Sequence, residues 1–188
     1  MPIRDQITEA ADSLFYERGF DATSFTDIAD AVGISRGNFY YHFKSKDDIL
    51  DAVIALRAAR TRAMLDKWAN DGNSPQERIR CFIRILITNR DKIMLHGCPV
   101  GTLSNELAKL NHAHRAQANS LFMLFRTWLA HQFVALGRKK DADTLAMHLL
   151  ARSQGVATLA NAFHDEAFIK LEVKQMNQWL AAIVAGKH

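Results

Sequence analysis

The chain has 188 residues, enough for one large domain or two small ones with a sizeable buried core. Hydrophobic residues make up 48% and charged residues 23%, the balance of an ordinary soluble globular protein. Charged residues interrupt every apolar run, so we expect no membrane-spanning helix and no membrane partner. Three prolines and nine glycines leave little material for the many turns of an all-β fold.

The first residues lead directly into a helical pattern, without an apolar secretory segment. The two cysteines, Cys81 and Cys98, form neither a C-x-x-C unit nor a disulfide framework. We therefore expect a cytoplasmic protein with reduced thiols and no cofactor.

The net charge of +4 is unevenly distributed along the chain. Residues 1–50 contain five cations and nine anions and so carry a net charge of −4. Within them, the stretch from Val32 to Lys46 has no acidic residue but contains Arg36, His42 and Lys44. A local basic edge of this kind is typical of a surface that approaches nucleic acid.

Helical signals begin at the N-terminus. An apolar stripe at helical spacing is formed by Ile3, Ile7, Ala11, Leu14 and Phe15. Gly19 is the expected C′ residue that ends this helix, and Phe20 follows at the position of the hydrophobic contact that often accompanies such an end. Ser24 and Asp27 form a variant capping box before a short helix that ends at Gly33. Ser35 is the expected cap of a third helix, which runs to about Phe43.

The rest of the chain is also helical by its apolar spacing, so we predict an all-α fold. Ser45 caps a longer helix to about Trp68, and a loop follows at 70–75. After a helix that starts at Pro75, the run 97–99 breaks the pattern. The remaining expected helices are Leu103–Leu110, a long helix capped by Asn111 and ended by Gly137, Asp141–Phe163 and Glu166–Ala185.

The pair Phe25–Val32 and Ser35–Phe43, joined by Gly33-Ile34, has the form of a helix-turn-helix. Reading a major groove requires a helix with a free N-terminus, a polar front and an apolar back. Gly37 lets the backbone come close to DNA, and the free N–H groups around it favour a phosphate. Phe39 and Phe43 are four residues apart and would point inward. The alternative for the whole segment is a small helical bundle with an aromatic core, of which Tyr40 would be partly a member.

Two runs carry a family resemblance: Thr23–Ala29 and Val32–Lys46 resemble the DNA-binding signature of the TetR (tetracycline-repressor-like) family. The match covers roughly the first quarter of the chain. It implies a three-helix DNA-binding domain at 1–46 and a helical ligand-sensing and dimerisation domain at 47–188. It also implies a homodimer that binds double-stranded DNA at a near-palindromic operator. The expected protein is a repressor that a small-molecule effector releases from this operator, and activation of transcription is the open alternative.

By the same resemblance, a set of polar residues would contact DNA: Thr26, Ser35, Arg36, Gly37, Asn38, Tyr40, Tyr41, His42, Lys44 and Lys46. Thr26 and Ser35 would contact phosphate near the helix starts, and Lys46 would anchor the next helix to the backbone. Arg36, Gly37 and Asn38 would face base edges. The guanidinium of Arg36 matches O6 and N7 of guanine.

Candidate effector contacts are apolar residues of the second part and one thiol: Phe82, Leu86, Met94, Cys98, Leu103, Phe122, Phe125, Trp128 and Met147. For any single apolar residue of this set, ordinary core is the favoured explanation. The expected dimer surface combines a small-residue face with a bulky one: Ala151, Gly155, Thr158, Leu159, Ala162, Met176, Trp179, Leu180 and Ile183. Its alternative is packing within one subunit.

The run Gly97–Leu107 resembles a Gly-Cys segment of some family members, including electrophile-responsive ones. A redox- or electrophile-sensing repressor acting through Cys98 is therefore the alternative function, and an inert, buried cysteine is the simpler explanation. His96 with Cys98, and His112 with His114, form no complete ligand set, so no metal is expected.

Two other protein classes are alternatives to a DNA-binding regulator. An all-α enzyme would need an ordered catalytic group, and Glu106 with His96 or His112 is all that can be assembled, so no enzyme is expected. A helical interaction protein that has lost DNA binding is supported only by the acidic balance of residues 1–50.

Overall fold

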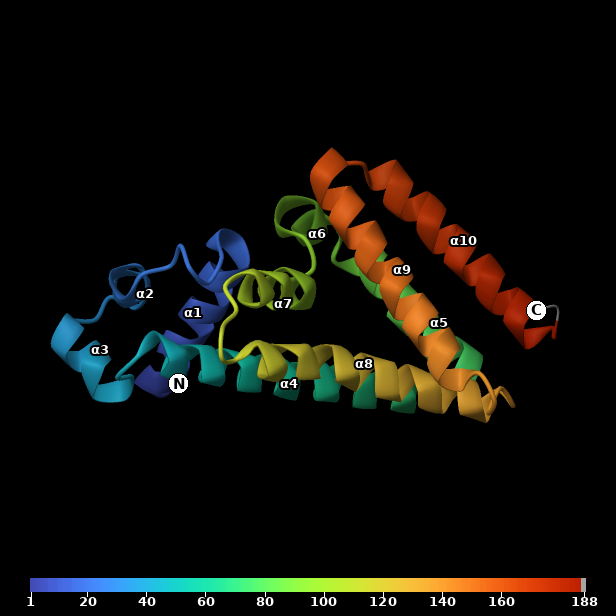
Figure 1. The fold of residues 1–188 in the computed structure, drawn as a ribbon, viewed down its shortest axis with the longest axis horizontal. Helices are drawn as coiled ribbons and strands as arrows, with labels where there is room; N and C mark the ends of the chain where they lie inside the picture. Colours follow the sequence, from blue (N-terminus) through green and yellow to red (C-terminus); the bar gives the residue numbers. More distant parts are fainter. Residues whose placement is uncertain (187–188) are drawn as a thin grey trace. The chain divides into compact units, whose positions relative to one another are not determined.

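The computed structural model describes residues 1–186, and this range contains ten α-helices and no strand (Figure 1). The expected all-α fold is confirmed. None of the described helices is both long and apolar enough to cross a lipid bilayer. The chain divides into two compact units: unit 1 holds residues 1–61 and 99–121, and unit 2 holds residues 62–98 and those from 122 onward.

Unit 1 is built on a hydrophobic core that the N-terminal helices share with a later segment. Its helices are α1 (Ile3–Arg18), α2 (Phe25–Val32), α3 (Arg36–His42), the first part of α4 (Lys46–Asp71), α7 (Pro99–Lys109) and the start of α8 (Arg115–Ala135). The stripe of α1 is buried in this core as expected. Leu103 and Leu107 of α7 are 2% and 0% exposed and belong to the same core.

A buried arginine joins three helices of unit 1. The side chain of Arg57 on α4 is only 7% exposed. Its Nε donates to Oδ1 of Asp12 at 2.6 Å, and its Nη1 donates to the carbonyl oxygen of Pro99 at 2.5 Å. Arg60 donates to the other oxygen of Asp12 at 3.1 Å. The guanidinium of Arg57 therefore fixes α4 against α1 and the first residue of α7.

Unit 2 packs its own helices around α5 and α9. Its complete helices are α5 (Pro75–Thr88), α6 (Arg90–His96), α9 (Ala142–Phe163) and α10 (Glu166–Val184). Helix α10 packs on α5 and α9, and α6 packs on α9. In Figure 1, α9 and α10 run side by side from the turn that His164 makes in the left-handed conformation. Asn161 on α9 donates to the carbonyl oxygen of Met94 on α6 at 2.9 Å.

The expected start of the long helix α8 is wrong. Asn111 has φ 48°, and α8 begins at Arg115. Asn111 instead ends α7: its N–H donates to the carbonyl of Ala108, and the N–H of His112 donates to that of Leu107. These two bonds form a Schellman motif, for which asparagine suits because it tolerates the left-handed region.

Two further boundaries differ from the expected ones. Helix α7 begins at Pro99 rather than near Leu103, because proline in a first turn leaves no intrahelical hydrogen bond unmade. The break at Asn89 between α5 and α6 contains no glycine or proline, so nothing in the local sequence signals it.

Replacement of Arg57 by alanine tests the buried network. We expect Arg57→Ala to lower the free energy of unfolding by about 3 kcal/mol, because it leaves the Pro99 carbonyl and Oδ1 of the partly buried Asp12 carboxylate without their donor. Urea unfolding would measure the loss. Arg62→Ala, at an exposed position of the same helix, is the control and should change the free energy by less than about 0.5 kcal/mol. Equal effects of the two substitutions would contradict this role.

Candidate nucleic-acid interface

Helix α2 is fixed at its start by a reciprocal cap. The backbone N–H of Asp27 donates to Oγ of Ser24 at 3.1 Å, and the N–H of Ser24 donates to the Asp27 carboxylate at 2.7 Å. The hydrogen bond from the Ser24 hydroxyl, followed by that from its backbone, holds the pKa of Asp27 below its ordinary value. The helix ends at Gly33, whose φ of 72° lies in the left-handed region. The capping box and the stop read from the sequence are both confirmed.

Helix α3 has only seven residues and depends on tertiary packing. Ser35 caps it by accepting the N–H of Asn38 at 3.3 Å. So short a helix is unstable alone, since nucleation costs more than a few hydrogen bonds return. Phe39 and Phe43 are each 1% exposed in the core of unit 1, and each burial contributes about 1.5–3 kcal/mol. The aromatic back of α3 therefore holds this helix in place.

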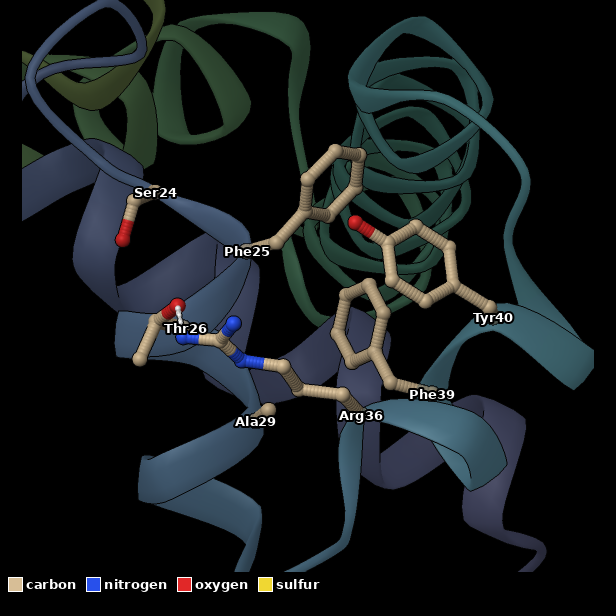
Figure 2. A pocket seen from close by; sticks show the side chains of 7 residues that line it. All are labelled: Ser24, Phe25, Thr26, Ala29, Arg36, Phe39 and Tyr40. Atoms are coloured by element: carbon tan, nitrogen blue, oxygen red, sulfur yellow. Dashed lines mark hydrogen bonds between the residues drawn. The ribbon is translucent and has the colours of Figure 1, made fainter.

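A shallow hollow of about 200 Å³ lies between α2 and α3 (Figure 2). The residues around it come from both helices and the cap: Ser24, Phe25, Thr26, Ala29, Arg36, Phe39 and Tyr40. Figure 2 shows Arg36 reaching toward Thr26, to whose Oγ1 it donates at 3.2 Å. Tyr40 is 44% exposed, and the centroid of its ring lies 5.5 Å from that of Phe25, so it packs against Phe25 but is not part of the core.

The polar front of α3 is open to solvent in unit 1. Of the residues expected to contact DNA, eight are exposed: Thr26, Ser35, Arg36, Gly37, Asn38, Tyr40, Tyr41 and Lys44. The other two, His42 and Lys46, are partly buried. Tyr41 is the most prominent aromatic ring, with 77% of its surface exposed. A Cβ added at Gly37 would meet nothing within 4 Å, so packing within the chain does not require glycine there.

The two lysines have internal partners. The ammonium of Lys44 donates to the carbonyl of Tyr40 at 2.6 Å. That of Lys46 donates to the carbonyl of Asp21 at 3.0 Å and lies 4.5 Å from the centre of the Phe20 ring. Desolvation by burial lowers the pKa of Lys46, and the nearby Asp21 carboxylate partly opposes that shift. Lys46 thus holds the segment between α1 and α2, while the exposed Lys44 can turn to a phosphate.

Two residues that the sequence did not assign to the helix-turn-helix also position it. Arg4 donates to the carbonyl of His42 at 2.6 Å, and its guanidinium lies 4.1 Å from the centre of the Phe43 ring. A cation at the C-terminus of a helix is favoured by the helix dipole, so Arg4 stabilises the end of α3. Its distance along the chain from α3 leaves no local signal.

The second of these residues is Glu106 on α7. Its carboxylate accepts the N–H groups of Phe20 and Asp21, each at 2.8 Å. Gly19, with φ 94°, makes room for it, because a Cβ there would lie 3.0 Å from a Glu106 oxygen. Glu106 therefore fixes the segment that leads from α1 into the helix-turn-helix.

The residues expected to line an effector cavity are not all brought together. The rings of Phe82 and Phe125 contact in unit 2 with centroids 5.8 Å apart. Leu103 lies in the core of unit 1, and Met147 is 47% exposed on α9. Leu86 is buried, whereas Met94, Cys98, Phe122 and Trp128 are partly buried. Helical periodicity identified these residues as apolar, but it does not reveal which unit or face each one joins.

The expected dimer surface is divided in a similar way. All five small or medium residues on α9 are exposed: Ala151, Gly155, Thr158, Leu159 and Ala162. On α10, by contrast, Met176, Leu180 and Ile183 are at most 3% exposed. These three side chains are buried in the core of unit 2, and Trp179 is partly buried. The bulky half of the expected face thus corresponds to the alternative, packing within the subunit.

Comparison with known proteins identifies the family. The model "Bacterial regulatory proteins, tetR family" matches residues 7–53, and "Transcriptional regulator LmrA/YxaF-like, C-terminal domain" matches residues 75–175. The chain belongs to the TetR family. The resemblance in the helix-turn-helix is thereby confirmed, and the family match extends over the second part of this TetR-family protein.

Individual relatives agree over nearly the whole chain. An uncharacterized HTH-type transcriptional regulator in the lacX 3' region of Lactococcus lactis subsp. lactis is 28% identical over 166 residues, covering 86% of this chain and 85% of that protein. The HTH-type transcriptional repressor DhaR of Mycobacterium sp. (strain GP1) is 26% identical over 164 residues, with coverage of 82% and 80%. A TetR transcriptional regulator from Legionella pneumophila superposes with a TM-score of 0.84 at 26% identity, over 95% of this chain and 97% of that one.

The cap of α2 makes a prediction about stability and pH. Ser24→Ala should lower the free energy of unfolding at pH 7 by about 1 kcal/mol. Because the pKa of Asp27 is depressed in the folded state, the cap stabilises the fold above the unfolded pKa, and this contribution is lost as pH falls through the lower folded pKa. The difference between wild type and Ser24→Ala should therefore shrink in acid.

Denaturant unfolding from pH 7 into the acid range would measure this difference. Ser13→Ala, an exposed position inside α1, serves as the control and should show no such pH dependence. A loss at Ser24 that is the same at every pH would refute the coupling to Asp27.

Proposed function

We propose that this TetR-family protein is a DNA-binding transcriptional repressor that a small molecule releases from its operator. One observation carries the proposal: α3 buries its two phenylalanines and leaves its polar front exposed. A helix of this kind can enter a major groove, because its apolar side stays packed in the protein core while its hydrogen-bond donors face the base edges.

The front of α3 has the chemistry for both parts of DNA recognition. Arg36 and Asn38 follow the capped N-terminus, where free N–H groups attract phosphate. Arg36 can donate to O6 and N7 of guanine, after exchanging its exposed hydrogen bond to Thr26 for one to the base. Tyr41 and Lys44, both exposed, would contact the sugar–phosphate backbone, which fixes register without reading sequence.

A homodimer would present two such helices. The exposed, small-residue face of α9 allows close approach of a second α9, and Leu159 and Phe163 on the same helix are 44% and 73% exposed. Exposed apolar side chains of this size commonly mark an interface. Two-fold symmetry would place the recognition helices in successive major grooves, about 34–36 Å apart, so the operator should be a near-palindrome.

Release by an effector has a physical route through α7. Glu106 on this helix accepts the two N–H groups before α2, and the helix starts directly after Cys98. An effector that binds more tightly to a state with α7 displaced would remove those acceptors and reorient the helix-turn-helix. Repression is the favoured sign, since the relative DhaR is named a repressor.

Gly37→Ala tests the interface without loosening the fold. The added methyl group meets nothing in the chain, and alanine favours helix over glycine, so stability should stay equal or rise by up to about 1 kcal/mol. Affinity for duplexes selected from random DNA should nevertheless fall at least about tenfold, because the methyl group lies where the backbone approaches the groove.

The measurement pairs a gel shift with urea unfolding of the same variant. Asn119→Ala, at an exposed position of α8 in unit 1, is the control for a surface substitution away from α3 and should bind DNA with wild-type affinity. If Gly37→Ala bound DNA with wild-type affinity, or if the wild-type protein selected no sequence, the proposed interface would be wrong.

A further inference from the structure

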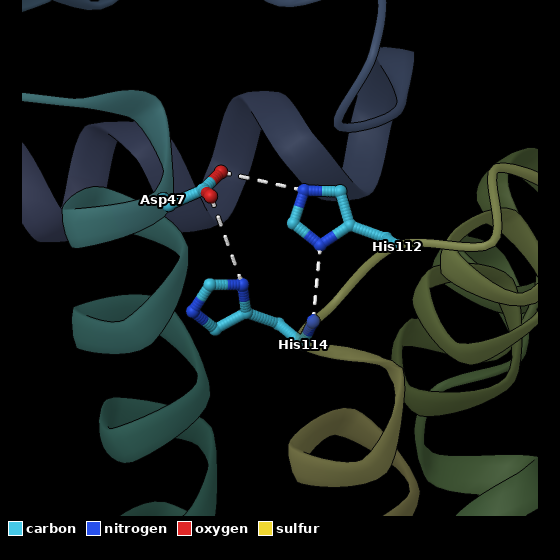
Figure 3. A group of neighbouring side chains, drawn as sticks. All are labelled: Asp47, His112 and His114. Carbon is cyan, nitrogen blue, oxygen red and sulfur yellow. Dashed lines mark hydrogen bonds and ion pairs between the residues drawn. The ribbon is translucent and has the colours of Figure 1, made fainter.

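The turn between α7 and α8 carries two histidines whose rings face the first turn of α4 (Figure 3). Nε2 of His112 lies 3.3 Å from Oδ1 of Asp47, and Nδ1 of His114 lies 3.9 Å from Oδ2 of the same carboxylate. One donor atom from each of the three residues lies within 4.8 Å of the other two. The structure thus combines the His-x-His pair with an acidic residue distant in sequence.

One ring nitrogen of His114 has no hydrogen-bond partner. Its Nδ1 is buried and makes no hydrogen bond, although it points toward Asp47. Its Nε2 lies 3.1 Å from Oδ1 of Asp51, one helical turn after Asp47. A carboxylate at Nε2 keeps the proton on that nitrogen and leaves the lone pair on Nδ1, which is the usual outer-shell arrangement of a metal-binding histidine.

We propose that Asp47, His112 and His114 form a binding site for a divalent transition-metal ion of the zinc type, with Asp51 as the positioning residue for His114. Two imidazoles and one carboxylate are typical ligands of zinc, cobalt, nickel and copper, whereas magnesium and calcium prefer oxygen. The 3.3 Å between the His112 and Asp47 donors is close to the edge of a tetrahedron with metal–ligand bonds of about 2.0–2.1 Å.

The solvent access of Asp47 and the restricted rotation of the His112 ring also suit metal binding. The Asp47 side chain is 52% exposed, so an ion can enter from solvent and keep a water as its fourth ligand. The two imidazoles are only 19% and 17% exposed. The His112 ring also packs edge-on against Phe20, with centroids 5.2 Å apart, which limits its rotation.

Metal binding requires one local change. Nδ1 of His112 accepts the backbone N–H of His114 at 3.2 Å, so in the metal-free state its proton lies on Nε2. Coordination through Nε2 moves that proton to Nδ1 and ends the hydrogen bond to His114. The exposed Ala113 between them allows the turn to adjust. The ion replaces one hydrogen bond with coordination of both rings, and it links the α7–α8 turn to α4 directly after Lys46.

The test is a titration of the full, untagged chain with Co²⁺, whose visible absorption reports coordination. We expect one Co²⁺ per chain, displacement by Zn²⁺ and a rise in the melting temperature with Zn²⁺. Asp47→Ala, His114→Ala and His114→Gln should each lose saturable binding and the rise in melting temperature. Asp51→Asn should weaken binding by about 10–100-fold, as for other outer-shell partners.

Two control variants separate this site from other ligands. His131→Ala, exposed on α8, should bind Co²⁺ as wild type does, and so should Cys98→Ser. Circular dichroism would confirm that each variant folds, and His114→Gln keeps a side chain that can hydrogen-bond to Asp51.

The proposal would be overturned if wild type showed no saturable Co²⁺ binding, if folded His114→Gln bound as wild type does, or if a thiolate charge-transfer band showed cysteine ligation. The measurement uses no DNA, so its outcome is independent of the proposed repressor function.

Discussion

Burial of Phe39 and Phe43 is the interaction on which the helix-turn-helix depends. A helix of seven residues does not persist by its own hydrogen bonds, so the two rings supply the stability that α3 lacks. Because both rings point into the core, the opposite side of the helix has no structural task. Its arginine, asparagine and tyrosine side chains, and the bare backbone of Gly37, remain available for another molecule.

The orientation of that front is set by polar contacts from distant parts of the chain. Glu106 and Lys46 both bond to the segment between α1 and α2, and Arg4 bonds to the end of α3. Arg57 adds a buried connection from α4 to α1 and to Pro99. Unit 1 consequently includes α7 as well as the N-terminal helices. Any shift of α4 or α7 would disturb these bonds, and the proposed effector response is assigned to α7, whose Glu106 holds the segment before α2.

Local signals in the sequence predicted much of this arrangement. The caps at Ser24, Ser35 and Ser45 are all present, since a cap needs only a side chain and the N–H group three residues later. The aromatic back of α3 followed from its spacing. Asn111 failed as a cap because asparagine serves a left-handed helix end equally well, and the choice depends on how the following chain packs.

Features that depend on tertiary placement escaped the sequence. Periodicity marked Leu103, Met176 and Leu180 as apolar, yet it could not show that the first joins the core of unit 1 or that the others are covered by unit 2. The carboxylates that face His112 and His114 lie on α4, far from them along the chain, so the pair looked incomplete. Glu106 appeared only as an isolated acid. Each of these side chains gains its role from a neighbour that no local pattern names.

The salt dependence of DNA binding tests the central claim most directly. Affinity for a selected duplex should fall steeply as KCl rises, because each lysine or arginine that contacts a phosphate releases counterions. Lys44→Ala should reduce the slope of log K against log [KCl] by about 1. It should lower the free energy of unfolding by less than about 1 kcal/mol, since the exposed ammonium donates only to the Tyr40 carbonyl at the end of α3. A wild-type slope near zero, or a slope that Lys44→Ala does not alter, would contradict the placement of the front of α3 against the DNA backbone.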